Sequence, residues 1–400
     1  MAKIVYQFYS VAWKSGLKGM IEMIPRIAKL DVDYIWFCPL YFSPRHDQGY
    51  DIADYKVIDP RFGTIEEFDI LVEIAHRFGV GVLMDLVLNH TSTEHRWFKE
   101  SPEYYCWSKE PPMAWENLFD KGSAWEYDES RGYYYLHMFH PKQADLRWFN
   151  NCGKDLNVSL VNEFRDIVRF WTKYHGVDGF RLDVPQSINK DFSKEKLSFN
   201  DMICGTQAIE VINAIFPRNH ENSPFLMMEC FDPMYGPVVE KYYKRTAVDY
   251  ILNVLLKDNA FDANGEYSEA FKRNIDVEGL MLDFESHDSV RFPSRGFDPK
   301  FGIRKLFESG AGGICLYQGQ ELGLYNPTSE ELPDEKMLEL DAQAEMLYLA
   351  GGDLDEIRKT SRANARVPIS MAEYARQEKD DDSILNFTKE QIDRWRMRQF

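Results

Sequence analysis

Two carboxylic acids end separate apolar runs of the chain, in surroundings that would give them different chemistry. Asp183 closes the run 176–183, and Arg181 precedes it by two residues, on the same side of an extended strand. A neighbouring guanidinium keeps such a carboxylate ionised. Glu229 ends the run Phe-Leu-Met-Met-Glu, where burial would raise the pKa of a carboxyl group toward that of a general acid. This pair could break a glycosidic bond with retention, because one carboxylate can attack the anomeric carbon while the other protonates the leaving oxygen.

The elements that must position these acids alternate along the chain. Short apolar runs are each followed by a polar loop and a segment of helical period, which is typical of a parallel sheet covered by helices. We predict strands at 4–8, 34–38, 81–85, 179–183, 225–229, 247–251, 280–284 and 313–317. Eight units predict an α/β fold, the (β/α)8 TIM barrel, whose active residues lie at the carboxyl ends of the strands. Asp85, Asp183, Glu229, His287 and Asp288 would then meet at one rim.

One long segment interrupts this alternation. Residues 90–155 are rich in Trp, Tyr, Pro and Glu and exceed the length of an ordinary βα loop, so they predict a small subdomain inserted after strand three. The barrel would comprise residues 1–89 and 156–400. After the eighth strand the chain is highly charged, with candidate helices at 330–346 and 353–365 and a closing helix at 383–400.

Composition excludes several classes of function. The chain has 400 residues, 44% of them hydrophobic, and 65 acidic against 47 basic residues give a net charge of -18. That charge disfavours nucleic acid and favours a neutral substrate. No run of 18 apolar residues occurs, and the N-terminus has the pattern of a strand and not of a signal sequence, so we expect no membrane association and a cytoplasmic location. The six cysteines lack metal-type spacing and are expected to be reduced thiols.

Four segments, in order, resemble the sequence regions shared by the α-amylase superfamily, glycoside hydrolase family 13. They are Asp85-Leu-Val-Leu-Asn89-His90, Gly179-Phe-Arg181-Leu-Asp183, Glu229 and His287-Asp288. The resemblance implies that Asp183 is the nucleophile, Glu229 the acid/base and Asp288 a third catalytic carboxylate. It also implies that Asp85 and Arg181 support the nucleophile, and that Asn89, His90 and His287 belong to the sugar-binding site.

The resemblance covers nearly the whole chain and is greatest to the oligo-1,6-glucosidase and α-glucosidase subfamily. Residues 48–55 and 361–366 are similar to two of its rim loops. By this resemblance Tyr50 would stack on the sugar, while Asp51 and Arg366 would hold its non-reducing end and make the attack exo. Val184 follows the nucleophile; in the subfamily a Val here goes with α-1,6 preference and a Thr with α-1,4.

These features predict a retaining, exo-acting hydrolase that releases glucose from short α-glucosides of the isomaltose or panose type. A transglycosylase or a sucrose/trehalose-type isomerase remains open, because it would use the same double displacement. A non-catalytic relative associated with a membrane transporter is disfavoured, since such proteins have a membrane helix and altered catalytic positions. The partner expected in every enzymatic case is a small oligosaccharide.

Two departures from the family affect these expectations. Many relatives have an Asp/Asn-rich calcium loop after strand one, but no carboxylate lies between Phe8 and Lys18 here, so we predict no metal and no cofactor. The family's C-terminal β-sandwich is expected to be absent, because no residues remain for it after Phe400. Either the protein is naturally short or the chain is part of a longer one.

Overall fold

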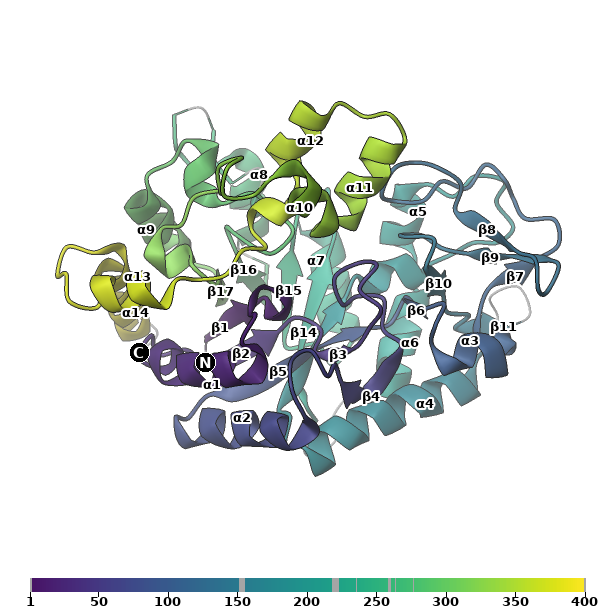
Figure 1. Ribbon diagram of the computed structural model, residues 1–400, viewed down its shortest axis with the longest axis horizontal. Helices are drawn as coiled ribbons and strands as arrows, with labels where there is room; N and C mark the ends of the chain where they lie inside the picture. The colour runs from purple at the N-terminus through teal and green to yellow at the C-terminus, as the bar shows by residue number, and fades with distance from the viewer. Residues whose placement is uncertain are drawn as a thin grey trace.

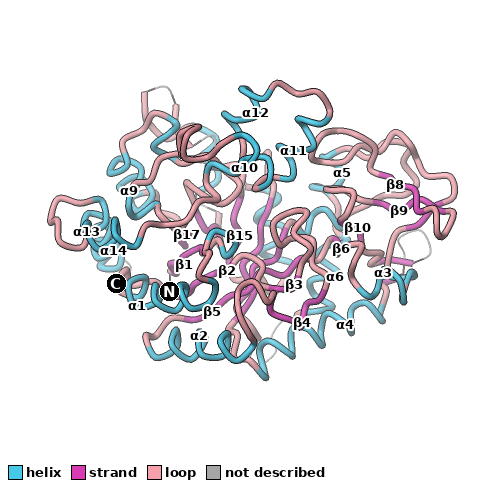
Figure 2. The backbone as a smooth tube through the Cα atoms, viewed as in Figure 1, coloured by secondary structure: helices cyan, strands magenta, loops and turns pink. Residues whose placement is uncertain are grey.

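Eight parallel strands close into a barrel at the centre of the molecule, as Figures 1 and 2 show. The computed structural model describes residues 2–150, 155–217, 223–234, 236–257, 260–262, 264–275 and 277–398. The order around the barrel is β1-β17-β16-β15-β14-β13-β5-β2, and the first strand pairs with both the last and the second. The (β/α)8 barrel predicted from the alternation is confirmed.

The barrel strands are β1 (Lys3–Phe8), β2 (Tyr34–Phe37), β5 (Gly81–Val87), β13 (Gly179–Asp183), β14 (Phe225–Cys230), β15 (Tyr250–Asn253), β16 (Leu280–Leu282) and β17 (Gly313–Tyr317). The sixth strand begins later than the predicted 247–251. Helix α7 ends at Arg245, and the Thr246 hydroxyl donates to the Tyr242 carbonyl oxygen. The chain therefore turns over residues 247–249 before it can pair with β14.

Helices surround the barrel and bury their apolar faces against it. They are α1 (Gly16–Ala28), α2 (Ile65–Arg77), α4 (Val158–Arg169), α6 (Gln207–Ile215), α7 (Pro237–Arg245), α8 (Glu269–Ile275), α9 (Pro299–Glu308) and α14 (Ile384–Arg398). In α2 the Thr64 side chain and Glu67 form a reciprocal capping box that fixes the first turn. The predicted closing helix is α14, which packs against α9; residues 399 and 400 of that prediction lie outside the described residues.

The segment between β5 and α4 forms small sheets of its own, at the right of Figure 1. Strand β6 (His90–Ser92) pairs with β10 (Gln143–Asp145), and β9 (Tyr133–Leu136) lies between β7 (Trp107–Ser108) and β8 (Trp125–Asp128). Two short strands, β11 (Phe149–Asn150) and β12 (Asp155–Leu156), lead back to the barrel. Trp115, Trp125 and Leu136 are buried in a core separate from that of the barrel.

The charged region after β17 folds differently from the prediction. Instead of one helix at 330–346 there are α10 (Asp334–Glu339) and α11 (Ala342–Leu349), and the second predicted helix is shortened to α12 (Leu354–Thr360). The break falls at Asp341, which is extended and whose carboxylate accepts hydrogen bonds from Gln343 N, Ser361 Oγ and Arg362 N. The helix is interrupted where this carboxylate binds the loop that contains Ser361 and Arg362.

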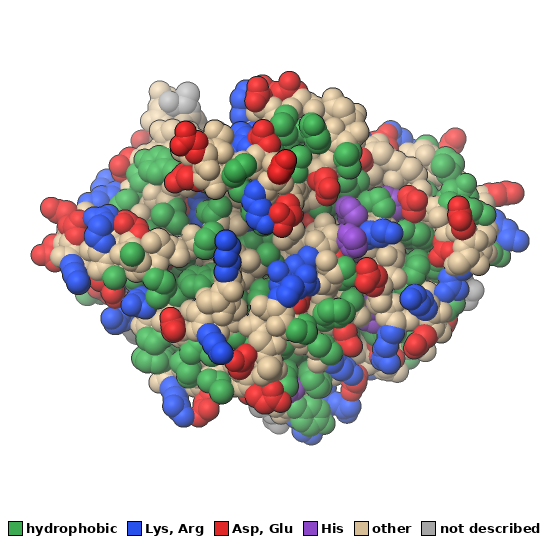
Figure 3. All heavy atoms as spheres, in the orientation of Figure 1, with side chains coloured by type: hydrophobic (Ala, Val, Ile, Leu, Met, Phe, Trp, Pro, Cys, Tyr) green, Lys and Arg blue, Asp and Glu red, His purple; other side chains and the backbone are tan. Residues whose placement is uncertain are grey.

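The remaining elements are β3 (Tyr41–Phe42) and β4 (Asp54–Ile58), which pair with each other, and the helices α3 (Arg96–Glu100), α5 (Phe199–Cys204) and α13 (Met371–Gln377). Across the face drawn in Figure 3, acidic and basic side chains are interspersed. Within the described ranges, no helix is long and apolar enough to cross a membrane. The described cysteines are free thiols, namely Cys38, Cys106, Cys204, Cys230 and Cys315, and Cys152 lies outside the described residues.

The backbones of β13 and β14 approach closely at Gly179, and a substitution there tests the packing of the barrel. A Cβ atom at Gly179 would lie 2.0 Å from the Phe225 carbonyl oxygen, whereas one at Gly312 would meet nothing closer than 3.7 Å. Gly179→Ala should therefore lower the free energy of unfolding by at least about 2 kcal/mol, because backbone has to move. Urea denaturation measures this. Gly312→Ala is the matched control and should change stability little; equal stability of the two variants would contradict the packing described.

Candidate active site

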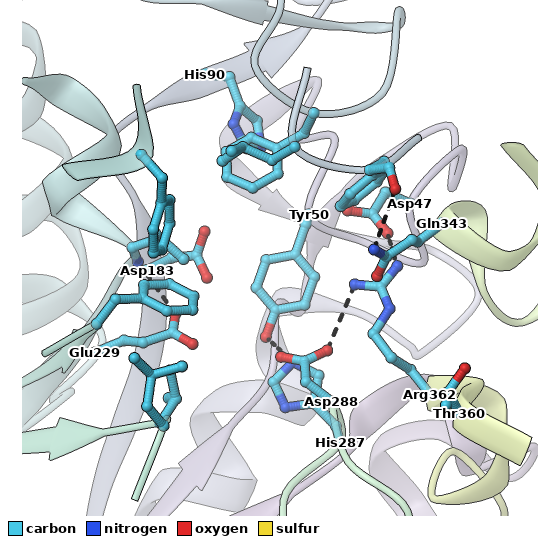
Figure 4. Close-up of a pocket in the computed structure, with 18 of the residues that line it drawn as sticks. Asp47, Tyr50, His90, Asp183, Glu229, His287, Asp288, Gln343, Thr360 and Arg362 are labelled. Carbon is cyan, nitrogen blue, oxygen red and sulfur yellow. Dashed lines mark hydrogen bonds and ion pairs between the residues drawn. The ribbon is translucent and has the colours of Figure 1, made fainter. Parts of the chain in front are cut away.

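A cavity of about 560 Å³ opens where β13 and β14 end, and the polar side chains predicted from the sequence gather around it (Figure 4). Its polar lining consists of Asp47, Tyr50, His90, Lys121, Asp183, Glu229, Lys257, His287, Asp288, Gln343, Thr360 and Arg362. Its apolar wall is Leu118, Phe119, Phe139, Val184, Phe199, Phe231, Val254 and Leu255. A concave, partly apolar site with converging titratable groups is the usual form of a small-molecule site.

The Arg181 guanidinium lies beneath the cavity and contacts three carboxylates. Its Nη1 lies 2.9 Å from Asp85 Oδ1 and also donates to Asp183, while its Nη2 lies 2.5 Å from Glu229 Oε2. The residue is 1% exposed, so these contacts replace its hydration. The adjacent strands β5, β13 and β14 supply the four groups, and their parallel register brings the side chains to one level.

Burial of this cluster alters its protonation. Burial raises the pKa of the Glu229 carboxyl group, and Arg181 acts in the opposite direction. Burial also raises the pKa of Asp183, which Arg181 again opposes. One guanidinium faces three buried carboxyl groups, so burial outweighs it and the pKa values of Asp183 and Glu229 stay above their ordinary values. Arg181 was expected to act on Asp183, and the structure shows that its positive charge is shared with Asp85 and Glu229.

Tyr50 and His287 form one side of the cavity. Their rings are stacked, with centroids 5.5 Å apart, and the Tyr50 hydroxyl lies 2.8 Å from His287 Nε2 and 3.0 Å from Asp85 Oδ2. Burial lowers the pKa of His287 well below its ordinary value, so the ring is neutral. Tyr50 is thereby fixed with its ring toward the cavity, as Figure 4 shows.

Asp288 lies across the cavity from Asp183 and Glu229, with 31% of its side chain exposed. Its Oδ1 accepts from Arg366 Nη2 at 2.8 Å and lies 3.5 Å from Arg362 Nη1. Burial would raise the pKa of Asp288, but the positive neighbours prevail and lower it. Because His287 is neutral, the two guanidinium groups carry that positive charge. Asp288 is therefore an anion at the cavity surface.

Two of the residues predicted to grip the sugar do not reach the cavity. The Asp51 carboxylate is fully buried and accepts from Ser43 Oγ, His46 N and Asp47 N, so it organises its own loop. Arg366 is 1% exposed and donates to the His287 and Leu340 carbonyl oxygens as well as to Asp288. Both predictions of direct sugar contact are wrong, because main-chain groups and Asp288 already occupy these side chains.

The cavity instead contains Asp47 and Arg362, which the sequence analysis missed. Arg362 Nη2 lies 3.4 Å from Asp47 Oδ1, and Arg362 is anchored from behind by Asp341 at 2.7 Å. Arg362 belongs to the segment 361–366 that the resemblance had picked out, and Asp47 immediately precedes the segment 48–55; they lie four and three positions before Arg366 and Tyr50. The loops were identified, but the choice of side chain depended on the break at Asp341, which no sequence pattern indicated.

Three further predicted site residues lie behind the lining. Asp85 and Asn89 are fully buried, and Arg181 is 1% exposed. Asp85 accepts from Trp36 Nε1 and Tyr50, in addition to Arg181. None of the three lines the cavity: Asp85 and Arg181 contact residues beneath it, in keeping with the supporting role that the resemblance implies, and Asn89, expected in the sugar-binding site, lies behind His90. Tyr50, His90, Val184 and His287, also predicted, do line the cavity.

A buried ammonium group joins the inserted segment to the barrel. Lys190 Nζ lies 2.8 Å from Asn89 Oδ1, 2.5 Å from the Ser187 carbonyl oxygen and 3.0 Å from Asp145 Oδ2. These oxygens come from the end of β5, from the loop after β13 and from β10. Asn89 in turn contacts His90 Nδ1 at 3.1 Å, and burial, with Lys190 nearby, lowers the pKa of His90 to about 3. His90 is thus a neutral, fixed group in the cavity wall.

Comparison with known proteins agrees with this geometry. The family model described as "Alpha amylase, catalytic domain" matches residues 12–369. Trehalose-6-phosphate hydrolase of Escherichia coli (strain K12) is 41% identical over 422 residues, which are 92% of this chain and 74% of that protein. Oligo-1,6-glucosidase of Heyndrickxia coagulans is 32% identical over 431 residues, 92% of this chain and 75% of that protein.

Solved structures give the same result. The crystal structure of Bacillus licheniformis trehalose-6-phosphate hydrolase superimposes with a TM-score of 0.79 at 28% identity, over 99% of this chain and 83% of that one. Isomaltulose synthase from Erwinia rhapontici NX5 shares the fold, with a TM-score of 0.83 at 24% identity and the same coverage. The chain belongs to the α-amylase family of glycoside hydrolases. It is an enzyme of that class, a glycosidase built on a TIM barrel.

The Lys190 contacts predict a large effect on stability. Lys190→Met leaves Asp145 buried without its counter-charge, which should cost about 3–5 kcal/mol in the free energy of unfolding. Urea denaturation measures the loss. Lys194→Met, at a side chain that is 41% exposed, is the control and should be nearly neutral. Adding Asp145→Asn to Lys190→Met should restore part of the loss; a Lys190→Met protein as stable as the wild type would show that the ammonium does not hold this joint.

Proposed function

We propose that the protein is a retaining, exo-acting α-glucoside hydrolase that releases glucose from short substrates. The observation that carries the proposal is the pairing of Asp183 and Glu229 on the two terminal nitrogens of Arg181, at the base of one cavity. Retaining glycosidases hold their two carboxyl groups about 5–5.5 Å apart, and sharing one guanidinium is compatible with that short separation.

The two halves of the reaction use these groups in turn. Asp183 attacks the anomeric carbon while Glu229 gives its proton to the glycosidic oxygen, so the aglycone leaves and a glucosyl ester forms on Asp183. Glu229, now ionised, takes a proton from water, which attacks the same carbon and releases glucose with net retention. The neutral rings of Tyr50 and His287 and the anionic Asp288 face the sugar and can bind its hydroxyls.

The exo character rests on the pair formed by Asp47 and Arg362. It lies on the side of the cavity opposite Asp183 and Glu229, and both side chains bear polar groups that can hold hydroxyls of a terminal glucose (Figure 4). A pocket closed behind one sugar accepts chain ends only. The α-1,6 preference rests on Val184, whose methyl groups line the cavity beside Asp183 and offer no hydroxyl to the leaving sugar.

A second candidate substrate is a phosphorylated disaccharide. The relatives named trehalose-6-phosphate hydrolase include the Escherichia coli protein at 41% identity. The observation that favours it is the presence of Lys121 and Lys257 in the cavity lining, in a chain of net charge -18. Lys257 is 5% exposed and lies 3.7 Å from Asp283 Oδ2, a distance that leaves its ammonium able to contact another anion.

We also propose that catalysis needs no metal and no cofactor, since each proton and each bond above is handled by Asp183 and Glu229. Among the described residues, no group of three or more His, Cys, Asp or Glu could hold a metal ion. Chelator should leave the rate and the melting temperature unchanged. A loss of rate that calcium reverses would overturn this proposal.

Replacing either carboxyl group should nearly abolish turnover. Asp183→Asn and Glu229→Gln should each lower kcat by about 10³-fold or more on isomaltose, because each removes one half of the displacement. An aryl α-glucoside with a good leaving group separates the roles: it should still form the glucosyl ester in the Glu229 variant and not in the Asp183 variant. Glu240→Gln, on an exposed turn of α7, is the control. Near wild-type turnover by either variant would disprove the assignment.

A substrate panel tests the remaining choices together. Isomaltose and panose should be hydrolysed faster than maltose, and Val184→Thr should raise the maltose to isomaltose ratio by about 5- to 160-fold, which corresponds to about 1–3 kcal/mol. If trehalose 6-phosphate were cut far faster than isomaltose, and Lys257→Met removed that advantage, the phosphorylated substrate would replace the first proposal. Accumulation of transfer products or isomerised sucrose would identify a transglycosylase or an isomerase.

A further inference from the structure

The residue after the nucleophile has an unusual backbone. Val184 has φ 31° and ψ 53°, in the left-handed region. Its Cβ is branched, and branched side chains are the ones that this region disfavours most. The other described non-glycine residues of positive φ are Asp31, Arg45, Gln48 and Lys121, and none of these is β-branched. A conformation of this kind persists where the surrounding structure enforces it, and such positions cluster at functional sites.

The turn at Val184 is held on both sides. Its carbonyl oxygen accepts from Ser187 N at 3.0 Å and from Ser187 Oγ at 2.6 Å. Its amide N–H points across to the neighbouring strand and donates to Glu229 Oε2 at 3.2 Å. The direction of this N–H is set by the peptide plane between Asp183 and Val184, at the end of β13, and the left-handed turn then carries the chain away from the strand. The last donor of β13 thus reaches the side chain of Glu229.

The donor divides the two oxygens of Glu229 between different tasks. Oε2 receives both Arg181 Nη2 and the Val184 amide, and within the described residues the hydrogen bonds to Glu229 all reach that oxygen. Oε1 is therefore left to exchange a proton with substrate. A carboxyl group held through one oxygen cannot rotate, which keeps the other in the direction of the scissile bond.

We propose that the main-chain N–H of Val184, at the start of a left-handed turn, is a positioning group that fixes Oε2 of Glu229 and leaves Oε1 for the glycosidic oxygen. This inference rests on the proposed role of Glu229 as acid/base. It makes residue 184 serve twice: its side chain lines the cavity, and its main chain orients the neighbouring carboxyl group.

The charged groups that face Glu229 set the direction of the expected pH effect. Arg181 and Lys257 are positive, and Asp85, Asp183 and Asp288 are negative. A donated hydrogen bond favours the ionised carboxylate, so the Val184 amide adds to the effect of the two cations. Removing the donor should raise the pKa of Glu229. The high-pH limb of kcat/KM, where the acid loses its proton, should then move to higher pH.

An amide-to-ester replacement removes the donor and keeps the side chain. The full-length protein carrying α-hydroxyisovaleric acid in place of Val184 should show the pKa of Glu229 raised by about one unit, read from the carboxyl ¹³C shift of labelled glutamate and from the high-pH limb. The matched control is the ester at Ser187, which weakens the turn and leaves the donor in place. No shift at 184, or equal shifts in both proteins, would overturn the proposal.

The steric part is tested by melting temperature. Asn tolerates the left-handed region and Thr does not, so Val184→Asn should melt above Val184→Thr. Val254, another β-branched residue of the lining, has no positive φ, and there Thr should melt above Asn. If the Asn and Thr variants melted in the same order at both sites, the backbone of Val184 would not be strained. Because the ¹³C titration and the melting order need no turnover, they separate failure of this inference from failure of the proposed hydrolysis.

Discussion

The arrangement of the site depends on one buried guanidinium. Arg181 contacts carboxylates from three adjacent strands, and each would be far more costly to bury alone. One positive charge only partly offsets the burial and mutual repulsion of these carboxyl groups, so the pKa values of Asp183 and Glu229 stay raised. The barrel register supplies this arrangement, since Arg181 faces Asp85 across one strand pair and Met227, two residues before Glu229, across the other.

Around that centre the protein uses neutral rings and ion pairs for different tasks. Burial keeps His90 and His287 uncharged, which suits groups that hydrogen-bond a neutral sugar. The pair formed by Asp47 with Arg362 connects two rim loops, and the pair formed by Lys190 with Asp145 connects the inserted segment to the loop after β13. Each pair is largely buried. Replacing one of its members should therefore lower the free energy of unfolding, because the other charge is left without a partner, even though the pair as a whole adds little stability.

The sequence was sufficient where local pattern and chemistry coincide. Strands show as short apolar runs, and Asp183 and Glu229 lie at the ends of two of them, so the barrel and the meeting of these two carboxyl groups at one cavity could be predicted. It was insufficient where tertiary contacts decide. Asp51 and Asp47 are both acidic and share a loop, and only the hydrogen bonds of Asp51 to that loop show which one faces the cavity. The helix break at Asp341 likewise depends on a contact with Arg362, which lies 21 residues further along the chain and outside any local sequence pattern.

The ion pair between Asp47 and Arg362 also constrains how the enzyme can be made. Its members are 315 residues apart, so one side of the pocket comes from the first eighth of the chain and the other from the last tenth. A ribosome must deliver residue 362 before this side of the pocket exists, and contacts of such long sequence separation form late in folding. Nascent chains that stop before Arg362 would therefore contain Asp183 and Glu229 without a complete pocket.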